Sequence, residues 1–111
     1  MICAAFYTAE NGLAGFTVSG HSGWAPSGED IVCAAVSSAV YMVINTLSDV
    51  CHISARIQVQ DGFVAYFMQD IDHTQQGMLI LKGLRMHLKQ LAQQFPAQMK
   101  TIDFKWRKNL C

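Results

Sequence analysis

His21 and Cys33 are the two side chains whose types and placement in this 111-residue sequence could support nucleophilic chemistry. His21 follows a strand-like run, and Cys33 falls in the first turn of a long apolar segment that we expect to be helical. The unpaired N–H groups and the dipole at a helix N-terminus favour a thiolate, which is the attacking form of cysteine. The pair therefore predicts a thiol nucleophile with a histidine base, and helix N-terminal amides that hold an oxyanion.

Both residues also have a purely structural interpretation. Free cysteine often serves as a small buried hydrophobic side chain, and His21 could be an ordinary histidine of a surface loop. A strand end and a helix start can be neighbours in space, so contact between the two side chains is geometrically possible. The residues alone leave these alternatives open.

Two polar residues flank the expected nucleophile. Asp30 is placed to cap the helix N-terminus, an interaction worth about 1 kcal/mol. Its carboxylate should point away from the sulfur, because a nearby negative charge disfavours a thiolate. Ser37 follows Cys33 by one helical turn and shares its face. We expect both to support the site, although Ser37 could simply belong to the polar stripe of the helix.

The segment between His21 and Asp30 is a loop rich in glycine and serine. Small residues resist local packing, so such a loop is typical of a segment that closes over a substrate. Its tryptophan could clamp a bound peptide. We therefore predict a substrate loop with these contributing residues: Ser22, Gly23, Trp24 and Gly28.

Histidine and cysteine are also zinc ligands, but their spacing argues against a metal. Cys33 and Cys51 would stand about 27 Å apart along one helix, too far to share a zinc ion or a disulfide within one subunit. The four cysteines show no CxxC spacing, which favours reduced thiols in a cytoplasm. We predict no metal and no cofactor.

Composition bears on partners and location. Hydrophobic residues make up 51% of the chain and charged residues only 14%, so we expect a second subunit to cover apolar surface in a homodimer. The net charge is zero, which gives no electrostatic basis for direct nucleic-acid binding. The chain begins with no signal-peptide pattern, and the apolar segment 31–50 carries several polar residues, so we expect a buried helix, no membrane span and a cytoplasmic protein.

Hydrophobic periodicity and turn signals predict one α+β domain over residues 1–111. Its elements follow the order ββαββαβ, with two helices packed on a mostly antiparallel sheet. Strands are expected at 2–8, 13–19, 54–60, 63–69 and 98–106, helices at 30–50 and 74–95, and hairpin turns at Asn11-Gly12 and Asp61-Gly62. In the last strand we expect Ile102, Phe104 and Trp106 to face inward, and Asp103 and Lys105 outward.

The motif formed by Gly20-His21 and the segment GEDIVCAAVS at 28–37 resembles the ribosomal-processing cysteine protease family (Prp, YsxB-like). The pattern of that family is a Gly-His at the end of the second strand, a flexible loop, and G-x-D-I-V-C-A-A-V-S opening a long helix. The order ββαββαβ also fits. The chain departs from the family at Ser22, which is commonly alanine, and by carrying Trp24 and Pro26 in the loop, where they could alter substrate fit.

The resemblance implies a homodimeric cytoplasmic protease of certain bacteria. Such a protease removes a short N-terminal extension from the large-subunit ribosomal protein numbered twenty-seven, which exposes residues needed near the peptidyl-transferase centre. By this resemblance His21 is the base and Cys33 the nucleophile, while Gly20, Asp30 and Ser37 match family positions that support the site.

We therefore predict a cysteine endopeptidase with a Cys/His dyad. One alternative is a non-catalytic ribosome-associated binding module that uses the basic C-terminus and exposed aromatic residues. Another is a thiol redox or acyl-transfer enzyme acting on small molecules. Replacing Cys33 by serine separates the first alternative from an enzyme, because a binding module should tolerate the change.

Overall fold

The computed structural model describes residues 1–10, 12–21, 30–69 and 75–105. Along the chain the elements are β1 (Ile2–Ala9), β2 (Gly12–Ser19), α1 (Ile31–Asn45), a π-helical turn η1 (Thr46–Val50), β3 (Ala55–Gln60), β4 (Phe63–Met68), α2 (Gln75–Gln94) and β5 (Met99–Lys105). They form one five-stranded sheet in the order β3-β4-β2-β1-β5. Only the β1–β5 pair among these strands is parallel. The predicted order ββαββαβ and the α+β class are confirmed.

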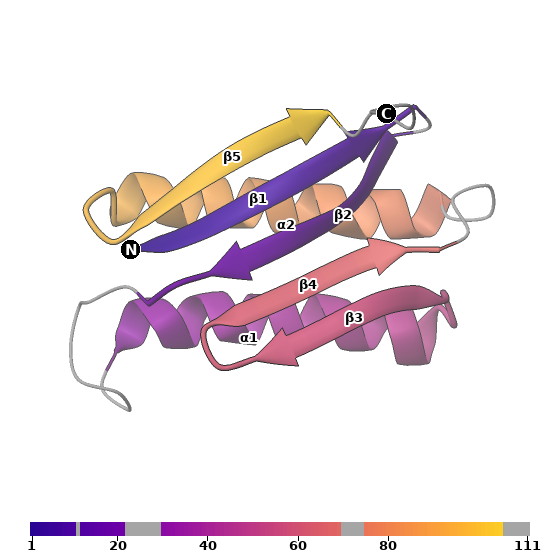
Figure 1. Cartoon of the computed structure of the whole chain (residues 1–111), viewed down its shortest axis with the longest axis horizontal. Helices are drawn as coiled ribbons and strands as arrows, with labels where there is room; N and C mark the ends of the chain where they lie inside the picture. Colours follow the sequence, from indigo (N-terminus) through magenta and orange to yellow (C-terminus); the bar gives the residue numbers. More distant parts are fainter. Residues whose placement is uncertain (11, 22–29, 70–74, 106–111) are drawn as a thin grey trace.

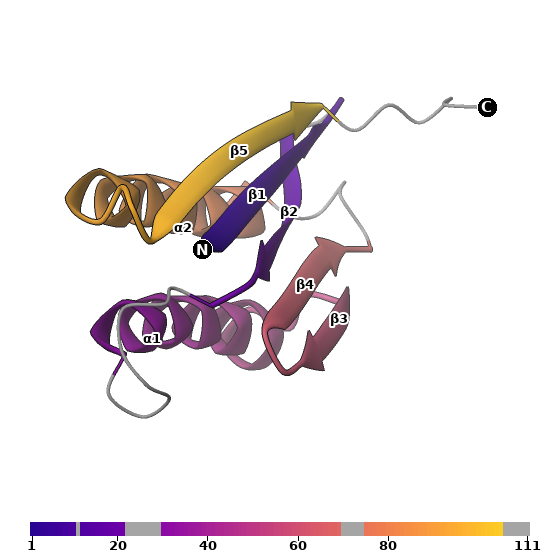
Figure 2. The same ribbon diagram turned by 60° about the vertical axis from the view of Figure 1, so that its left-hand side comes forward.

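Both helices lie on the same face of the sheet (Figures 1 and 2). Alternate side chains of the strands point toward them, as the period of a strand requires. The core between the sheet and the helices contains three aromatic side chains from the strands, three valines from α1 and three leucines from α2. They are Phe6, Phe16 and Tyr66, then Val32, Val36 and Val40, and finally Leu81, Leu84 and Leu88. The predicted leucine stripe of the second helix is thereby confirmed.

Helix α1 and the π-helical turn together span Ile31–Val50, 20 residues that are long and apolar enough to cross a membrane by length and composition. In the fold one face of this segment packs on the core. Only 33% of its most apolar 18-residue window is buried, and Ile31, Met42 and Val50 are exposed, so the expected burial of the whole helix is wrong. The helix ends in a π-helical turn instead of continuing as a regular α-helix to Val50. His52 follows with a positive φ of 55°, a conformation typical of the residue just after a helix.

The two hairpins differ in how well their turns were predicted. Gln60 pairs with Phe63, so Asp61-Gly62 is the two-residue turn expected. In the first hairpin Ala9 pairs with Gly12, so Gly12 opens β2 instead of completing the turn. Its φ of +121° suits glycine, which explains a glycine at the first position of the strand. Asn11 lies outside the described residues.

The predicted orientation of the last strand is wrong. Asp103 faces α2, where its carboxylate accepts hydrogen bonds from Arg85 and Lys89 at 2.9 to 3.0 Å. Phe104 points to the opposite, open face, where its ring stacks on Tyr7 with centroids 5.3 Å apart. Cationic side chains on α2 stabilise an acidic residue on the inner face, a pairing that hydrophobic alternation within the strand does not reveal. Trp106 lies outside the described residues.

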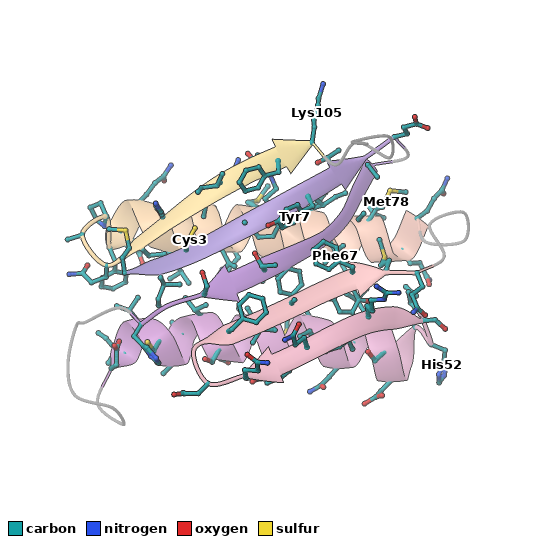
Figure 3. The ribbon with its side chains drawn as sticks, in the orientation of Figure 1. Cys3, Tyr7, His52, Phe67, Met78 and Lys105 are labelled. Atoms are coloured by element: carbon teal, nitrogen blue, oxygen red, sulfur yellow. The ribbon has the colours of Figure 1, made fainter. Side chains whose placement is uncertain are left out.

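The open face carries an aromatic cluster that we define as Tyr7, Phe67 and Phe104. Tyr7 and Phe67 have ring centroids 5.2 Å apart and bridge β1 and β4 across β2 (Figure 3). Gly15 of β2 makes room for them, because a Cβ there would lie 2.6 Å from the Phe67 ring. Phe104 remains 45% exposed in the single chain. The aromatic cluster is thus an apolar patch on the open face, of a kind that often meets another subunit.

Candidate active site

His21 and Cys33 line one groove of about 580 Å³. The groove lies between the first turns of α1, the end of β2 and the β3–β4 hairpin, and Gly20 and Ser37 also line it. His21 is exposed and Cys33 is half-buried. The fold therefore brings together four of the residues that the sequence assigned to the site, although His21 and Cys33 come from different elements.

Asp30 caps α1 as predicted. Its Oδ1 accepts hydrogen bonds from the backbone N–H of Val32 at 3.0 Å and of Cys33 at 2.9 Å. The N–H of Ala34 donates to the Asp30 carbonyl at 3.1 Å. The carboxylate thus points at the helix backbone, which places Cys33 at the third helical position.

This cap changes one expectation about the chemistry. We expected helix N-terminal amides to stabilise an oxyanion, but the amides of Val32, Cys33 and Ala34 already donate to Asp30. The first turn of α1 still orients its dipole toward the sulfur. The amides of Val32 and Cys33 are taken up by the cap, in charge-assisted hydrogen bonds that are stronger than neutral ones.

His21 is held beside two glycines. Gly20 has a φ of +91°, and its N–H donates to the Gly62 carbonyl at 2.9 Å, which joins the end of β2 to the β3–β4 turn. Gly62 has a φ of +70°, and a Cβ built on it would lie 2.9 Å from His21 Nε2. The His21 imidazole therefore packs against the turn at Gly62, because glycine has no side chain to occupy that space.

Sequence reasoning identified Asp61-Gly62 only as a turn and missed its contact with His21. No local pattern shows that contact, because it depends on the pairing of β2 with β4. It also missed Tyr41, which lines the groove two helical turns beyond Cys33. Helical spacing from Cys33 through Ser37 could have found Tyr41, since all three share one face of α1.

The substrate loop predicted at Ser22, Gly23, Trp24 and Gly28 lies outside the described residues. It stays a prediction. Among the residues that the structure describes, no group of three or more histidine, cysteine or acidic side chains is arranged to hold a metal ion. Within that same part of the chain, Cys3, Cys33 and Cys51 are free thiols.

The groove holds a cysteine at a helix start and a histidine at a strand end, residue types that can act together as a thiol nucleophile and its base. The family described as cysteine protease Prp matches residues 1–100, and the chain belongs to that family. A Bacillus subtilis relative named ribosomal processing cysteine protease Prp is 23% identical over 96 residues, which cover 82% of this chain and 86% of the relative.

Solved structures share the fold. The S. aureus ribosomal processing protease Prp in complex with a covalently linked product peptide superposes with a TM-score of 0.86 at 20% identity, covering 93% of this chain and 99% of that one. The same S. aureus protease with a substrate peptide gives 0.80 at 19% identity, with the same coverage of both chains. SMU.848 from Streptococcus mutans gives 0.81 at 22% identity, covering 96% and 99%.

Proposed function

We propose that this protein is a cysteine endopeptidase that removes the N-terminal extension of large-subunit ribosomal protein twenty-seven during ribosome maturation. The observation that carries the proposal is the shared groove of His21 and Cys33 at the start of α1, in a chain of the Prp family. The B. subtilis relative is named for ribosomal processing, and the S. aureus structures hold a substrate or product peptide. These names support a peptide substrate for this chain.

In the proposed mechanism the Cys33 thiolate attacks the scissile carbonyl carbon and forms a C–S bond. His21 holds the proton taken from the thiol and gives it to the departing amine as the C–N bond breaks. Water then loses a proton to His21 and adds to the thioester, and the C–S bond breaks to restore the thiolate. Ser37 faces the same groove and supports the site, while Asp30 holds the helix start in place.

The decisive experiment is cleavage of a peptide that spans the extension and the start of the mature ribosomal protein, followed by mass spectrometry. Cys33→Ala should abolish cleavage, because the nucleophile is gone. Cys51→Ala is the matched control, since Cys51 follows the other end of the same helical segment and does not line the groove. A Cys33→Ala variant that still cleaves, or a parent protein that does not, would overturn the proposal.

We further propose that the open face of the sheet joins two copies in a cytoplasmic homodimer. The aromatic cluster supports this, because it leaves Phe104 partly exposed in the single chain and charged residues are scarce. Light scattering should give about twice 12.3 kDa at micromolar concentration. Phe104→Lys should shift the mass toward the monomer, and a clean monomer for the parent chain would contradict the assignment.

A further inference from the structure

Among the residues that the structure describes, strand β3 is an edge strand whose single neighbour is β4. Its side chains on the helix-facing side include Ile57 and Val59, which are 44% and 52% exposed. Exposed edges of this kind are usually protected by charges, prolines or a covering element, because their backbone can pair with another chain. At β3 the helix-facing positions are apolar.

The register shows which backbone groups of β3 point to the free edge. Gln60 and Phe63 flank a two-residue turn, so they form a hydrogen-bonded pair, and such pairs alternate along an antiparallel ladder. The alternation requires a hydrogen-bonded pair at Ser54 and Gln69, and the Gln69 N–H donates to the Ser54 carbonyl at 3.0 Å. The N–H and C=O groups of Ile57 and Val59 therefore point away from β4.

The free edge is continuous with the groove of Cys33. Val59 lines that groove together with Cys33 itself, and Tyr41 lines its helical wall with 42% of its surface exposed. An extended chain whose scissile carbonyl reaches Cys33 would leave the groove beside Val59. There it meets outward backbone donors and acceptors, together with apolar side chains at every second position.

We propose that the substrate peptide binds as an added strand along β3. Its main chain exchanges hydrogen bonds with Ile57 and Val59, and its alternate side chains are apolar and pack against Ile57, Val59 and Tyr41. Strand addition gives affinity through the main chain and selectivity through alternate side chains. This inference rests on the proposed peptide cleavage. A second copy of the chain paired on the same edge would compete for the space at the mouth of the groove.

Backbone N-methylation of the peptide tests the proposal with the unmodified protein. Each position of the extension peptide is methylated in turn, and kcat and KM are measured. Because a methylated amide cannot donate, we expect KM to rise about tenfold or more at every second position beyond the cleavage site on one side, with little change between them. Cleavage without this two-residue period would overturn strand addition but leave the protease function standing. A parent protein that does not cleave the unmethylated peptide would overturn both.

Two variants of Ile57 separate the contribution of its backbone N–H from the contribution of its side chain. Ile57→Pro removes an outward N–H without removing a hydrogen bond to β4, whereas Ile57→Thr keeps that N–H and shortens the apolar contact. We expect KM to rise for Ile57→Pro well beyond Ile57→Thr. Gln58→Thr, on the opposite side of the strand, should leave KM unchanged.

Alkylation of Cys33 by iodoacetamide and circular dichroism show that each variant keeps a folded site. Light scattering on Ile57→Pro tests whether a second copy of the chain, instead of the peptide, pairs with the β3 edge. Conversion of a dimer to a monomer by this change would mean that the edge pairs with a second copy and would overturn the proposal. An unchanged mass with a raised KM supports it.

Discussion

The two edges of the sheet are built differently, although a helix lies over each half of it (Figure 1). At the β5 edge, Asp103 forms ion pairs with Arg85 and Lys89, so the edge strand is tied to α2. At the β3 edge, Ile57 and Val59 remain exposed, and among the described residues no side-chain hydrogen bond or ion pair joins this strand to α1. Val59 at this second edge also lines the groove of Cys33.

The same packing of a helix on the sheet can therefore stabilise one edge of the sheet and leave the other edge available for binding. Surface ion pairs contribute about 1 kcal/mol or less, yet at β5 they satisfy charges and fix the helix over the strand. At β3 the corresponding inner positions hold apolar side chains, of which Ile57 and Val59 stay exposed. Such a surface is costly to leave exposed, and the peptide strand proposed above would cover it beside Cys33.

The largest expected effect comes from the β3 side of the molecule. His21→Ala should lower kcat/KM by about 10²-fold or more, because it removes both the base and the proton donor for the amine. The loss should not add to that of Cys33→Ala, since the two residues act as one unit. Steady-state cleavage of the extended peptide measures this, with circular dichroism as the control for folding. A folded variant with near-parental activity would rule out the Cys/His mechanism.

The next effect concerns the turn that positions His21. Gly62→Ala should lower kcat/KM about tenfold, because the new Cβ would lie 2.9 Å from His21 Nε2 and the residue has a φ of +70°. Gly83→Ala is the matched control on α2, where an added Cβ meets nothing within 4 Å. It should keep full activity and stabilise the helix by about 0.5–1 kcal/mol. Equal activities for the two variants would contradict a positioning role for the turn.

The residues proposed to carry the chemistry could be picked out from the sequence, because His21, Asp30 and Cys33 belong to local motifs at element ends. The helix cap and both helix stripes follow from local spacing in the same way. The orientation of Asp103 and the contact of Gly62 with His21 depend on which elements become neighbours. Those neighbours are set by sheet order and by pairing between distant strands, which the periodicity of a single strand does not contain.

A smaller effect is expected at the start of α1. Asp30→Ala removes the acceptor for the N–H groups of Val32 and Cys33, so the free energy of unfolding should fall by about 1 kcal/mol. Asp30→Ser should recover most of that loss, since serine also caps helices. Urea unfolding of the three proteins measures the difference. If alanine and serine were equally destabilising, the cap would not be the source of the effect.

The smallest effect tests the β5 edge. The hydrogen bond from Arg85, with a further one from Lys89, holds the pKa of the Asp103 carboxyl below its usual value of 3.8. A lowered pKa in the folded state stabilises the protein above that value, and the stabilisation is lost as the pH falls through and below it. Because Asp103 is well exposed, Asp103→Asn should cost only about 0.2–1 kcal/mol at neutral pH, and less in high salt. The difference between parent and variant should shrink as the pH falls below 3.8, while cleavage by the variant at neutral pH should be unchanged. A loss of activity comparable to that of Gly62→Ala would mean that the two edges are coupled, and that the ion-paired edge also shapes the groove.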